Sequence, residues 1–434
     1  MKIRIFQRKV DTMSYSEQAL SKIEDGDLKE GNRLYAWALR KDDADTLNSF
    51  AEELYSLGFD NKAKRIYEKL LEQYPDEDSL RVNLADIAIG QGKTDQALQL
   101  LAEVEPSSDA YLQSLLVSAD LYQTEELYEV SGQKLLEAER IAPEEPIVRF
   151  ALGEFYNMMQ NYKKAAAYYL GLIKQGILSL SAVNLVGRLA TAYAGMGKFE
   201  TSMAYFEQIK PVDQTPDILF QQGFVYLQLK NYPRAIEVLE KLRDTNPDYV
   251  SLYPILAQAQ AQNNDATAAL KTVQEGISFD EYNEDLYSQA AELANQLGQY
   301  EDVEHYLTEA LKLNPEQMKA VVQLSNLYIK QKRYQDNVDL LQPYISENDL
   351  DPQIYWNIAV SDEHLDELAA AKTAYQNAYP FFTNNAEFLR SAFYFFRQIG
   401  LTEWAVKCLR AYLKLVPDDD ELSLILEDYE NEGF

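Results

Sequence analysis

Apolar residues recur along this chain with the spacing of short helices that come in pairs. Residues 150–173, FALGEFYNMMQNYKKAAAYYLGLI, show one such pair. In each half a small residue precedes a tyrosine by three or four positions: Gly153 before Tyr156, then Ala165 before Tyr169. A polar dipeptide interrupts the pattern between the two halves. Because residues three and four apart share one face of a helix, the stretch predicts two amphipathic helices joined by a turn.

The same pattern repeats along almost the whole chain. Counterparts of the small residue Ala165 lie at Ser131, Ala97 and Ala63, each 34 residues from the next, with Gly31 as a weaker first member. After Ala165 the step is 37 residues to Ser202 and 33 to Ala235, and the 34-residue step then continues through Ala269, Val303, Asn337, Ala371 and Ala405. Self-similarity at such a period indicates a repeat protein with twelve units.

Turn signals and prolines punctuate these units. Glycine or asparagine separates the two helices of many units, as at Gly58, Gly92, Gly197, Asn231 and Gly298, and proline often closes a unit, as at Pro75, Pro143, Pro247, Pro315 and Pro417. Proline cannot continue a helix, so it marks the unit boundary. Where two helices cross, only Gly, Ala or Ser lets the backbones approach closely, and a larger residue would overpack the crossing by about 1–3 kcal/mol.

With this period and its small-residue and tyrosine positions, the chain resembles the tetratricopeptide repeat (TPR) family. The resemblance covers about residues 16–417 and implies an all-α solenoid of about twelve helix-turn-helix repeats that form a right-handed superhelix. Two units depart from the pattern, because Val303 and Asn337 replace the small residue, and we expect wider crossings there. The 37-residue step predicts a longer connection near residues 174–183.

The two ends of the chain differ from the repeats. Residues 1–15 form an N-terminal extension, which is basic but has no apolar segment typical of a secretory signal. Residues 418–434 are acidic, and Leu422, Ile425, Leu426 and Tyr429 share one helical stripe. We therefore predict a capping helix and tail, since a terminal repeat must present a polar outer surface. A frayed acidic tail is the alternative.

Composition narrows the class of protein. The 434 residues carry a formal net charge of −30, which argues against nucleic-acid binding and against adhesion to an anionic membrane. No apolar run is long enough to span a bilayer, so no membrane insertion is expected. Cys408 is the single cysteine, which excludes an intramolecular disulfide and favours a cytoplasmic location.

The sequence holds no recognisable catalytic or metal-binding pattern. His305 and His364 lie in different repeats, and neither belongs to a metal-binding motif. No glycine-rich phosphate loop or nucleophile motif occurs. We interpret Cys408, three residues after the small residue Ala405, as a packed thiol rather than a nucleophile. The protein is therefore predicted to be no enzyme and to need no cofactor or metal.

The resemblance to TPR proteins implies that ligands bind in a concave groove lined by the first helix of each repeat. The residue after the small crossing residue of each first helix, as Glu154 follows Gly153, should point into this groove. At 34-residue spacing this residue is acidic four times in succession: Glu52, Asp86, Asp120 and Glu154. Further along, the predicted groove residues are Phe220, Phe224, Gln258, Glu292, Asn326, Trp356, Arg390, Tyr394 and Arg397, with Gln262, Asn295, Gln296, Lys319 and Lys330 nearby.

These positions suggest how a partner segment would bind. The acidic ladder (Glu52, Asp86, Asp120 and Glu154) would hold Lys or Arg of the partner, Phe220 and Phe224 would anchor an apolar side chain, and Arg390 and Arg397 would take a carboxylate. The alternative for the ladder is a solvated face that the repeats share by ancestry. The aromatic residues could equally be packing residues.

Three functions remain open from the sequence. The leading hypothesis is a non-enzymatic scaffold or adaptor that binds a peptide segment or helix of a partner protein in the groove, and a basic segment is one candidate. A structural or oligomeric assembly factor is the second, and the oligomeric state is undetermined. A peptide-sensing regulator is the third, and it is disfavoured because only about fifteen residues precede the first helix, too few for an output domain.

Overall fold

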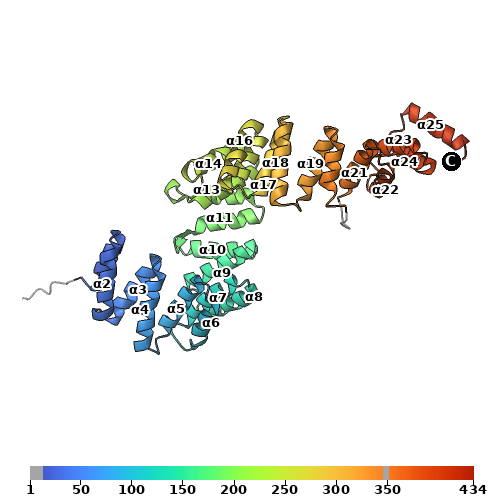
Figure 1. Cartoon of the computed structure of the whole chain (residues 1–434). Coiled ribbons are helices and arrows are strands. Elements are labelled where there is room, and N and C mark those ends of the chain that lie inside the picture. The colour runs from blue at the N-terminus through green and yellow to red at the C-terminus, as the bar shows by residue number, and fades with distance from the viewer. Residues whose placement is uncertain (1–12, 346–350) are drawn as a thin grey trace, which may run out of the picture. The chain divides into compact units, whose positions relative to one another are not determined.

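The computed structural model describes residues 13–345 and 351–434 and divides the chain into two compact units, Met1–Asp213 and Gln214–Phe434. Most of the predicted N-terminal extension, residues 1–12, lies outside the described residues. The part of the chain that the structure describes contains 25 α-helices, one short 3-10 helix and one two-stranded hairpin (Figure 1). The prediction of an all-α solenoid built from twelve helical hairpins is confirmed.

Unit 1, Met1–Asp213, contains six hairpins. Its helices are α1 (Tyr15–Glu24), α2 (Leu28–Lys41), α3 (Ala44–Ser56), α4 (Asp60–Gln73), α5 (Asp78–Gly90), α6 (Thr94–Ala102), α7 (Tyr111–Thr124), α8 (Tyr128–Ile141), α9 (Pro146–Met158), α10 (Tyr162–Lys174), α11 (Leu185–Gly195) and α12 (Phe199–Phe206). A short 3-10 helix, η1, spans Pro211–Asp213. Each odd-numbered helix is the first of its hairpin.

Unit 2, Gln214–Phe434, contains the other six hairpins and one last helix. Its helices are α13 (Pro216–Gln228), α14 (Tyr232–Thr245), α15 (Leu252–Gln262), α16 (Ala266–Phe279), α17 (Glu284–Gln296), α18 (Tyr300–Leu313), α19 (Met318–Lys330), α20 (Tyr334–Leu341), α21 (Pro352–His364), α22 (Leu368–Ala378), α23 (Ala386–Gln398), α24 (Thr402–Leu415) and α25 (Asp420–Asn431).

The small crossing residues lie where the sequence predicts them. Ala63, Ala97, Ala165, Ala235, Ala269, Ala371 and Ala405 are fully buried. Ser202 is also fully buried, and its hydroxyl donates to the carbonyl of Ala190 at 2.7 Å, which ties α12 to α11. Close backbone approach is therefore the rule at these crossings, as the repeat pattern predicts.

Asn337 and Val303, the two residues that replace the small crossing residue, have different surroundings. Asn337 is fully buried and donates to the carbonyl of Asn357 at 3.2 Å and to the hydroxyl of Ser361 at 2.8 Å, so hydrogen bonds take the place of close packing. Val303 is buried beside a cavity, described below.

A left-handed residue ends the first helix in each hairpin. Six of the twelve are glycines, Gly26, Gly58, Gly92, Gly197, Gly298 and Gly400, and six are not, Glu126, Gln160, Lys230, Asn264, Lys332 and Asp366. The following amide bonds back to a carbonyl five residues earlier, as from Asn161 to Tyr156 at 2.8 Å. This is the Schellman arrangement, whose hydrogen bonds offset the strain that a non-glycine residue suffers there.

The longer connection between α10 and α11 holds a feature that the sequence does not predict. β1 (Ser179–Leu180) and β2 (Val183–Asn184) pair antiparallel, with Ser179 opposite Asn184 and Leu180 opposite Val183. The turn residues Ser181 and Ala182 have φ values of 49° and 61°. Two successive positive φ values define a type I′ hairpin turn, which explains how three extra residues are accommodated.

The last helix, α25, packs against α24. Leu422 is 1% exposed, and Ile425, Leu426 and Tyr429 are partly buried against the same apolar cluster. The side chain of Asp419 accepts from the amide of Leu422 at 3.1 Å and so caps the helix. The stripe that the sequence analysis singled out is therefore the face that α25 buries.

Candidate functional site

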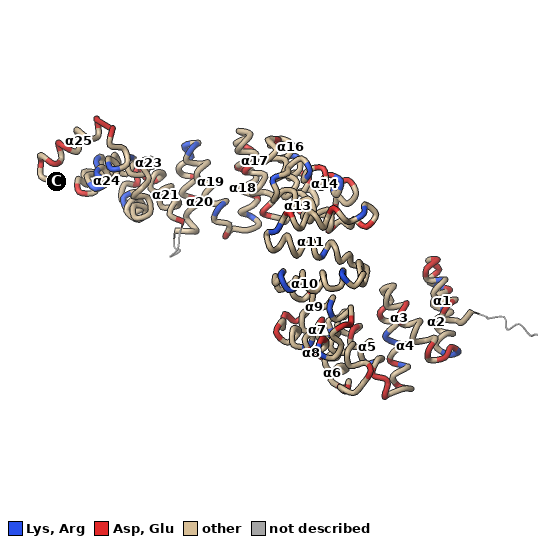
Figure 2. Tube along the Cα trace, turned by 180° about the vertical axis from the view of Figure 1, so that it is seen from behind, with Lys and Arg blue, Asp and Glu red and all other residues tan. Residues whose placement is uncertain are grey.

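The acidic ladder lies on the first helices of unit 1. Glu52, Asp86, Asp120 and Glu154 belong to α3, α5, α7 and α9, and each follows a buried small residue, Ala51, Ala85, Ala119 or Gly153. Glu52 and Asp120 are exposed, whereas Asp86 and Glu154 are partly buried. Figure 2 marks the Asp and Glu positions in red along the backbone trace. The repeat therefore places the same chemical group at the same position in four consecutive hairpins.

The two middle carboxyl groups of the ladder have raised pKa values, mainly because they are desolvated. Burial raises the pKa of the Asp86 carboxyl and the charge of Asp120 raises it further, while a hydrogen bond with Tyr55 opposes the rise. Desolvation also raises the pKa of Asp120. Tyr67, whose pKa is raised mainly by burial, lies within the field of Glu52 and Asp86. A cation placed here would relieve the repulsion and lower both carboxyl pKa values.

The carboxylate of Glu154, at the end of the ladder, already has two partners within the protein. Its two carboxylate oxygens accept from the hydroxyl of Tyr169 at 2.6 Å and pair with the guanidinium of Arg188 at 2.9 Å. Arg188 stands on α11, the first helix of the following repeat. The sequence analysis did not identify this partner. Arg188 lies 34 residues, one repeat period, after Glu154, and this spacing could have predicted the pair. Among the residues that the structure describes, Glu52, Asp86 and Asp120 have no such guanidinium partner.

The two predicted apolar anchors in unit 2, Phe220 and Phe224, differ in their surroundings. Phe220 packs against Tyr249 with ring centroids 5.4 Å apart, and the hydroxyl of Tyr249 donates to Asp217 at 2.9 Å. Phe224, one turn later on α13, is partly exposed, and Gln258 on α15 is exposed. Phe220 therefore contributes to packing between neighbouring repeats, which leaves Phe224 as the better candidate for contact with a ligand.

A cavity of about 440 Å³ lies at predicted groove positions of α17 and α19. Its polar lining comes from Glu292, Asn295, Gln296, Gln323, Asn326 and Lys330, and its apolar lining from Ala291, Val303, Leu307 and Leu327. Val303 of α18 is the residue that replaces the small crossing residue. The structure thus brings together Glu292 and Asn326, two of the predicted site residues, beside a crossing that was expected to be wide.

Charged and amide groups around this cavity are held by short contacts. The ammonium of Lys319 pairs with Glu292 at 2.5 Å. Lys330 donates to the hydroxyl of Tyr300 at 2.9 Å and lies 4.2 Å from the centroid of its ring. The side-chain carbonyl of Asn326 accepts from Asn357 at 2.7 Å, so its amide group keeps its two N–H donors in an exposed position.

The last part of the predicted site divides into packing and exposed residues. Trp356 meets Phe382 and Phe388 edge to face, with centroids 5.2 and 5.5 Å apart, so its ring contributes to the core of unit 2. Arg390 lies 5.9 Å from the ring of Tyr394, and a hydrogen bond with that tyrosine raises the pKa of Arg390. Arg397 lies 6.0 Å from the ring of Phe393. Arg390, Tyr394 and Arg397 are exposed on α23.

The described residues offer few groups for chemistry. Cys408 is fully buried, and burial raises the pKa of its thiol to about 12, so it is protonated at neutral pH. No group of three or more His, Cys, Asp or Glu side chains in the described ranges could hold a metal ion. None of the helices described is long and apolar enough to cross a membrane.

Repeat and fold together define the class of protein, a tetratricopeptide repeat protein. Sequence profiles described as tetratricopeptide repeat match residues 61–117, 220–284 and 294–357. Profiles described as "YpiA-like, tetratricopeptide repeats" and "YpiA-like, C-terminal tetratricopeptide repeats" match residues 123–177 and 352–419. The TPR repeat-containing protein YpiA of Bacillus subtilis (strain 168) is 32% identical over 418 residues, which is 96% of this chain and 98% of YpiA. The chain belongs to the YpiA-like family of TPR proteins.

Solved structures are similar at lower sequence identity. A chain in the crystal structure of the APC/C hetero-tetramer Cut9-Hcn1 is 14% identical with a TM-score of 0.42, over 95% of this chain and 88% of that one. The C-terminal part of a TPR repeat-containing protein from Cytophaga hutchinsonii is 12% identical with a TM-score of 0.41, over 63% of this chain and 97% of that one. TPR folds generally mediate protein–protein interactions, and TPR proteins are generally non-enzymatic scaffolds.

Proposed function

We propose that this protein is a cytoplasmic, non-enzymatic scaffold that binds an extended segment or a helix of a partner protein on the first helices of its repeats. The observation that carries the proposal is the cavity between α17 and α19. It lies at first-helix positions that the repeat pattern predicts to face the groove, and it is lined by both amides and apolar groups. A few polar groups around an apolar floor are typical of a site that fixes the orientation of a ligand.

The chemistry of this cavity suits a peptide backbone with one apolar side chain. Asn295, Gln296 and Gln323 provide amide donors and acceptors, and Val303 and Leu307 provide an apolar surface. An extended peptide presents alternating N–H and C=O groups that such amides can satisfy, while a side chain enters the apolar space. The acidic ladder of unit 1 adds a second region, which suits Lys or Arg of a basic partner segment.

Variants of the cavity amides test the first part of the proposal. The double variant Asn295→Ala/Gln323→Ala removes amide groups for which the structure shows no side-chain hydrogen bond within the protein, so the fold should remain intact. The matched control is Lys271→Ala/Glu301→Ala, two exposed positions on α16 and α18. In affinity capture from the native cell with quantitative mass spectrometry, we expect a partner that the control variant recovers and the cavity variant loses. Identical recovery by both variants would reject the cavity as the binding site.

The ladder is tested separately with Glu52→Gln/Asp120→Asn, which neutralises the two exposed carboxylates. We expect recovery of a basic partner to fall and to become less sensitive to salt, because the ionic part of the interaction is screened. Since Asp86 and Asp120 have raised pKa values, binding of a basic segment should also strengthen as the pH rises through the carboxyl range. Recovery and salt dependence that match those of the wild type would identify the ladder as a solvated face.

A further inference from the structure

The last hairpin of unit 2 carries a net positive charge, and the segment after it is strongly acidic. Between residues 386 and 415, which span α23 and α24, there are five Lys or Arg and two Glu, whereas residues 416–434 contain eight Asp or Glu and no Lys or Arg. Figure 2 shows the basic residues on α23 and α24 and the acidic ones on α25. The chain as a whole has a formal net charge of −30, so this basic hairpin differs in sign from the average of the chain.

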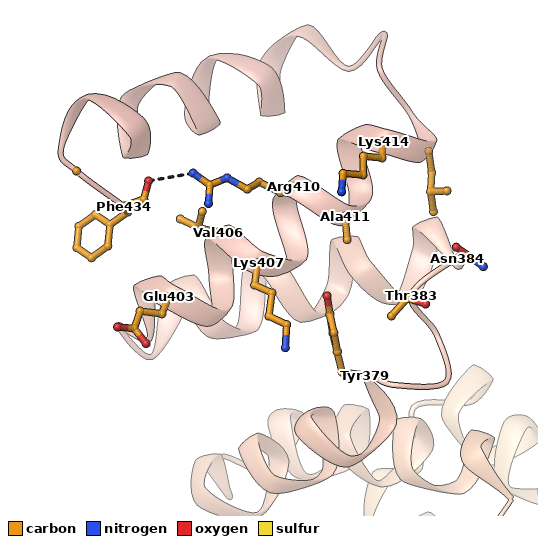
Figure 3. Close-up of a pocket in the computed structure, with 12 residues that line it drawn as sticks. Tyr379, Thr383, Asn384, Glu403, Val406, Lys407, Arg410, Ala411, Lys414 and Phe434 are labelled. Atoms are coloured by element: carbon orange, nitrogen blue, oxygen red, sulfur yellow. Dashed lines mark hydrogen bonds between the residues drawn. The ribbon is translucent and has the colours of Figure 1, made fainter.

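Three of these cations line a cavity of about 740 Å³ (Figure 3). Lys407, Arg410 and Lys414 follow one another along a single face of α24. The rest of the lining is Tyr379, Thr383, Asn384, Glu403, Val406, Ala411, Leu415, Gly433 and Phe434. The cavity is thus formed by the second helix α24, the turn after α22 and the end of the chain after α25, and none of its lining residues is a predicted groove residue.

Two of the three cations have no carboxylate partner among the described residues. Lys407 is held between two rings, with its ammonium 4.2 Å from the centroids of both Tyr379 and Trp404. The structure shows no ion pair for Lys407 or Lys414. Glu403 is the one acidic residue in the lining. An aromatic clamp positions the ammonium of Lys407 while leaving its charge uncompensated.

The third cation, Arg410, already binds acceptor groups at one end of this cavity. Arg410 donates to the side chain of Glu430 at 3.3 Å and to the main-chain oxygen of Phe434 at 3.0 Å (Figure 3). Both acceptors belong to the acidic segment after α24, and Phe434 is also a lining residue of the cavity. A carboxylate and a main-chain oxygen therefore already meet Arg410 at one end of the site, and Lys407 and Lys414 remain for further anions.

We propose that this cavity binds an acidic peptide segment of a partner protein that also carries an aromatic residue. Carboxylates of the segment pair with Lys407 and Lys414, and its aromatic side chain lies against Tyr379 and Leu415. The site is distinct from the first-helix face, so the protein engages acidic and basic segments at different places. The choice of a peptide over a small anion rests on the size of the cavity and on its combined apolar and cationic lining.

Fluorescence anisotropy with a defined probe tests the proposal. The probe is a fluorescein-labelled peptide of sequence Ser-Glu-Asp-Phe-Glu-Asp-Phe-Ser, and the full chain is titrated into it. We expect saturable binding that weakens with salt and weakens about tenfold or more in Lys407→Gln/Lys414→Gln. The control Lys241→Gln/Lys271→Gln makes the same change in charge on α14 and α16 and should bind like the wild type. If the double variant fails to fold, the single variant Lys414→Gln tests the proposal in its place, because it removes no contact that the structure shows.

The other outcomes separate this proposal from its rivals. Absence of binding, unchanged binding by Lys407→Gln/Lys414→Gln, or equal weakening in both double variants would overturn it. Displacement of the probe by inorganic phosphate, at an ionic strength where sodium chloride does not displace it, would show a site for small anions instead. Replacing both Phe residues of the probe by Ala should weaken binding, and unchanged binding would refute the aromatic contact. Asn295→Ala/Gln323→Ala should bind the probe like the wild type, so failure at one site leaves the other open.

Discussion

At the scale of single residues, close packing where two helices cross depends on glycine as much as on the large residues beside it, because glycine has no side chain. A Cβ atom built on Gly153 of α9 would lie 2.6 Å from Cε1 of Tyr169. That tyrosine is fully buried, and its hydroxyl is fixed to Glu154 at 2.6 Å. The ring has little freedom to move away, so Gly153 is required by the packing of α9 against α10.

Gly153→Ala should therefore destabilise this hairpin although alanine favours helix. We expect the free energy of local unfolding of α9 and α10 to fall by about 1–3 kcal/mol because the crossing is overpacked. Native-state hydrogen exchange of the amides in both helices measures it. Gly171→Ala is the matched control in the same hairpin, because no atom lies within 4 Å of the added Cβ, and it should gain up to about 1 kcal/mol from helix propensity. Equal changes in both variants would contradict the role of the crossing.

At the scale of elements, the turns show what sequence reasoning could and could not predict. The hairpin positions follow from small residues and helical periodicity, and the structure confirms them even where the left-handed turn residue is Lys230 or Asp366 instead of glycine. The hairpin β1–β2 escaped prediction because Ser181 and Ala182 are not the Asn-Gly type of residue that marks a type I′ turn. Its strands of two residues each are also too short to show an alternating pattern.

The helix positions of the candidate residues were predictable, but the contacts between them were not. Repeat spacing placed Glu52, Asp86 and Asp120 on equivalent positions of successive first helices, and the structure adds that Glu292 and Asn326 line one cavity. It could not reveal which long side chains of neighbouring repeats would reach one another, as Lys319 reaches Glu292. Such contacts depend on rotamers and on the offset between repeats, neither of which a sequence period encodes.

The strained turn between β1 and β2 gives a prediction for Ala182. Its φ of 61° is costly for alanine but not for glycine, so Ala182→Gly should stabilise the hairpin by about 0.5–1 kcal/mol. Exchange of the Leu185 amide, which donates to Leu178 at 3.0 Å across the base of the connection, reports the change. Ala142→Gly is the control, because Ala142 has a φ of −135° and glycine should bring no gain there. Slower exchange in the control variant as well would argue against the turn as the cause.

At the scale of the whole molecule, the chain is a linear series of packed hairpins. Within the part that the structure describes, every substantial helix–helix contact joins helices one or two places apart in chain order, such as α15 with α16 or α17. In such a chain, stability is a sum of repeat terms and nearest-neighbour terms, and a defect should remain local. A cooperative globule would instead transmit a core defect to all of its elements.

Leu256→Ala tests this linear character within unit 2. Leu256 of α15 is fully buried among residues of the neighbouring helices, so its truncation should cost about 2–5 kcal/mol through lost burial and a cavity. We expect faster hydrogen exchange from α14 to α17, because these helices share the damaged core. Protection of α23 and α24 should stay as in the wild type, since their apolar cluster contains neither Leu256 nor its neighbours. Uniform loss of protection across unit 2 would mean that its repeats unfold as one, and a ligand bound at one repeat would then stabilise all of them.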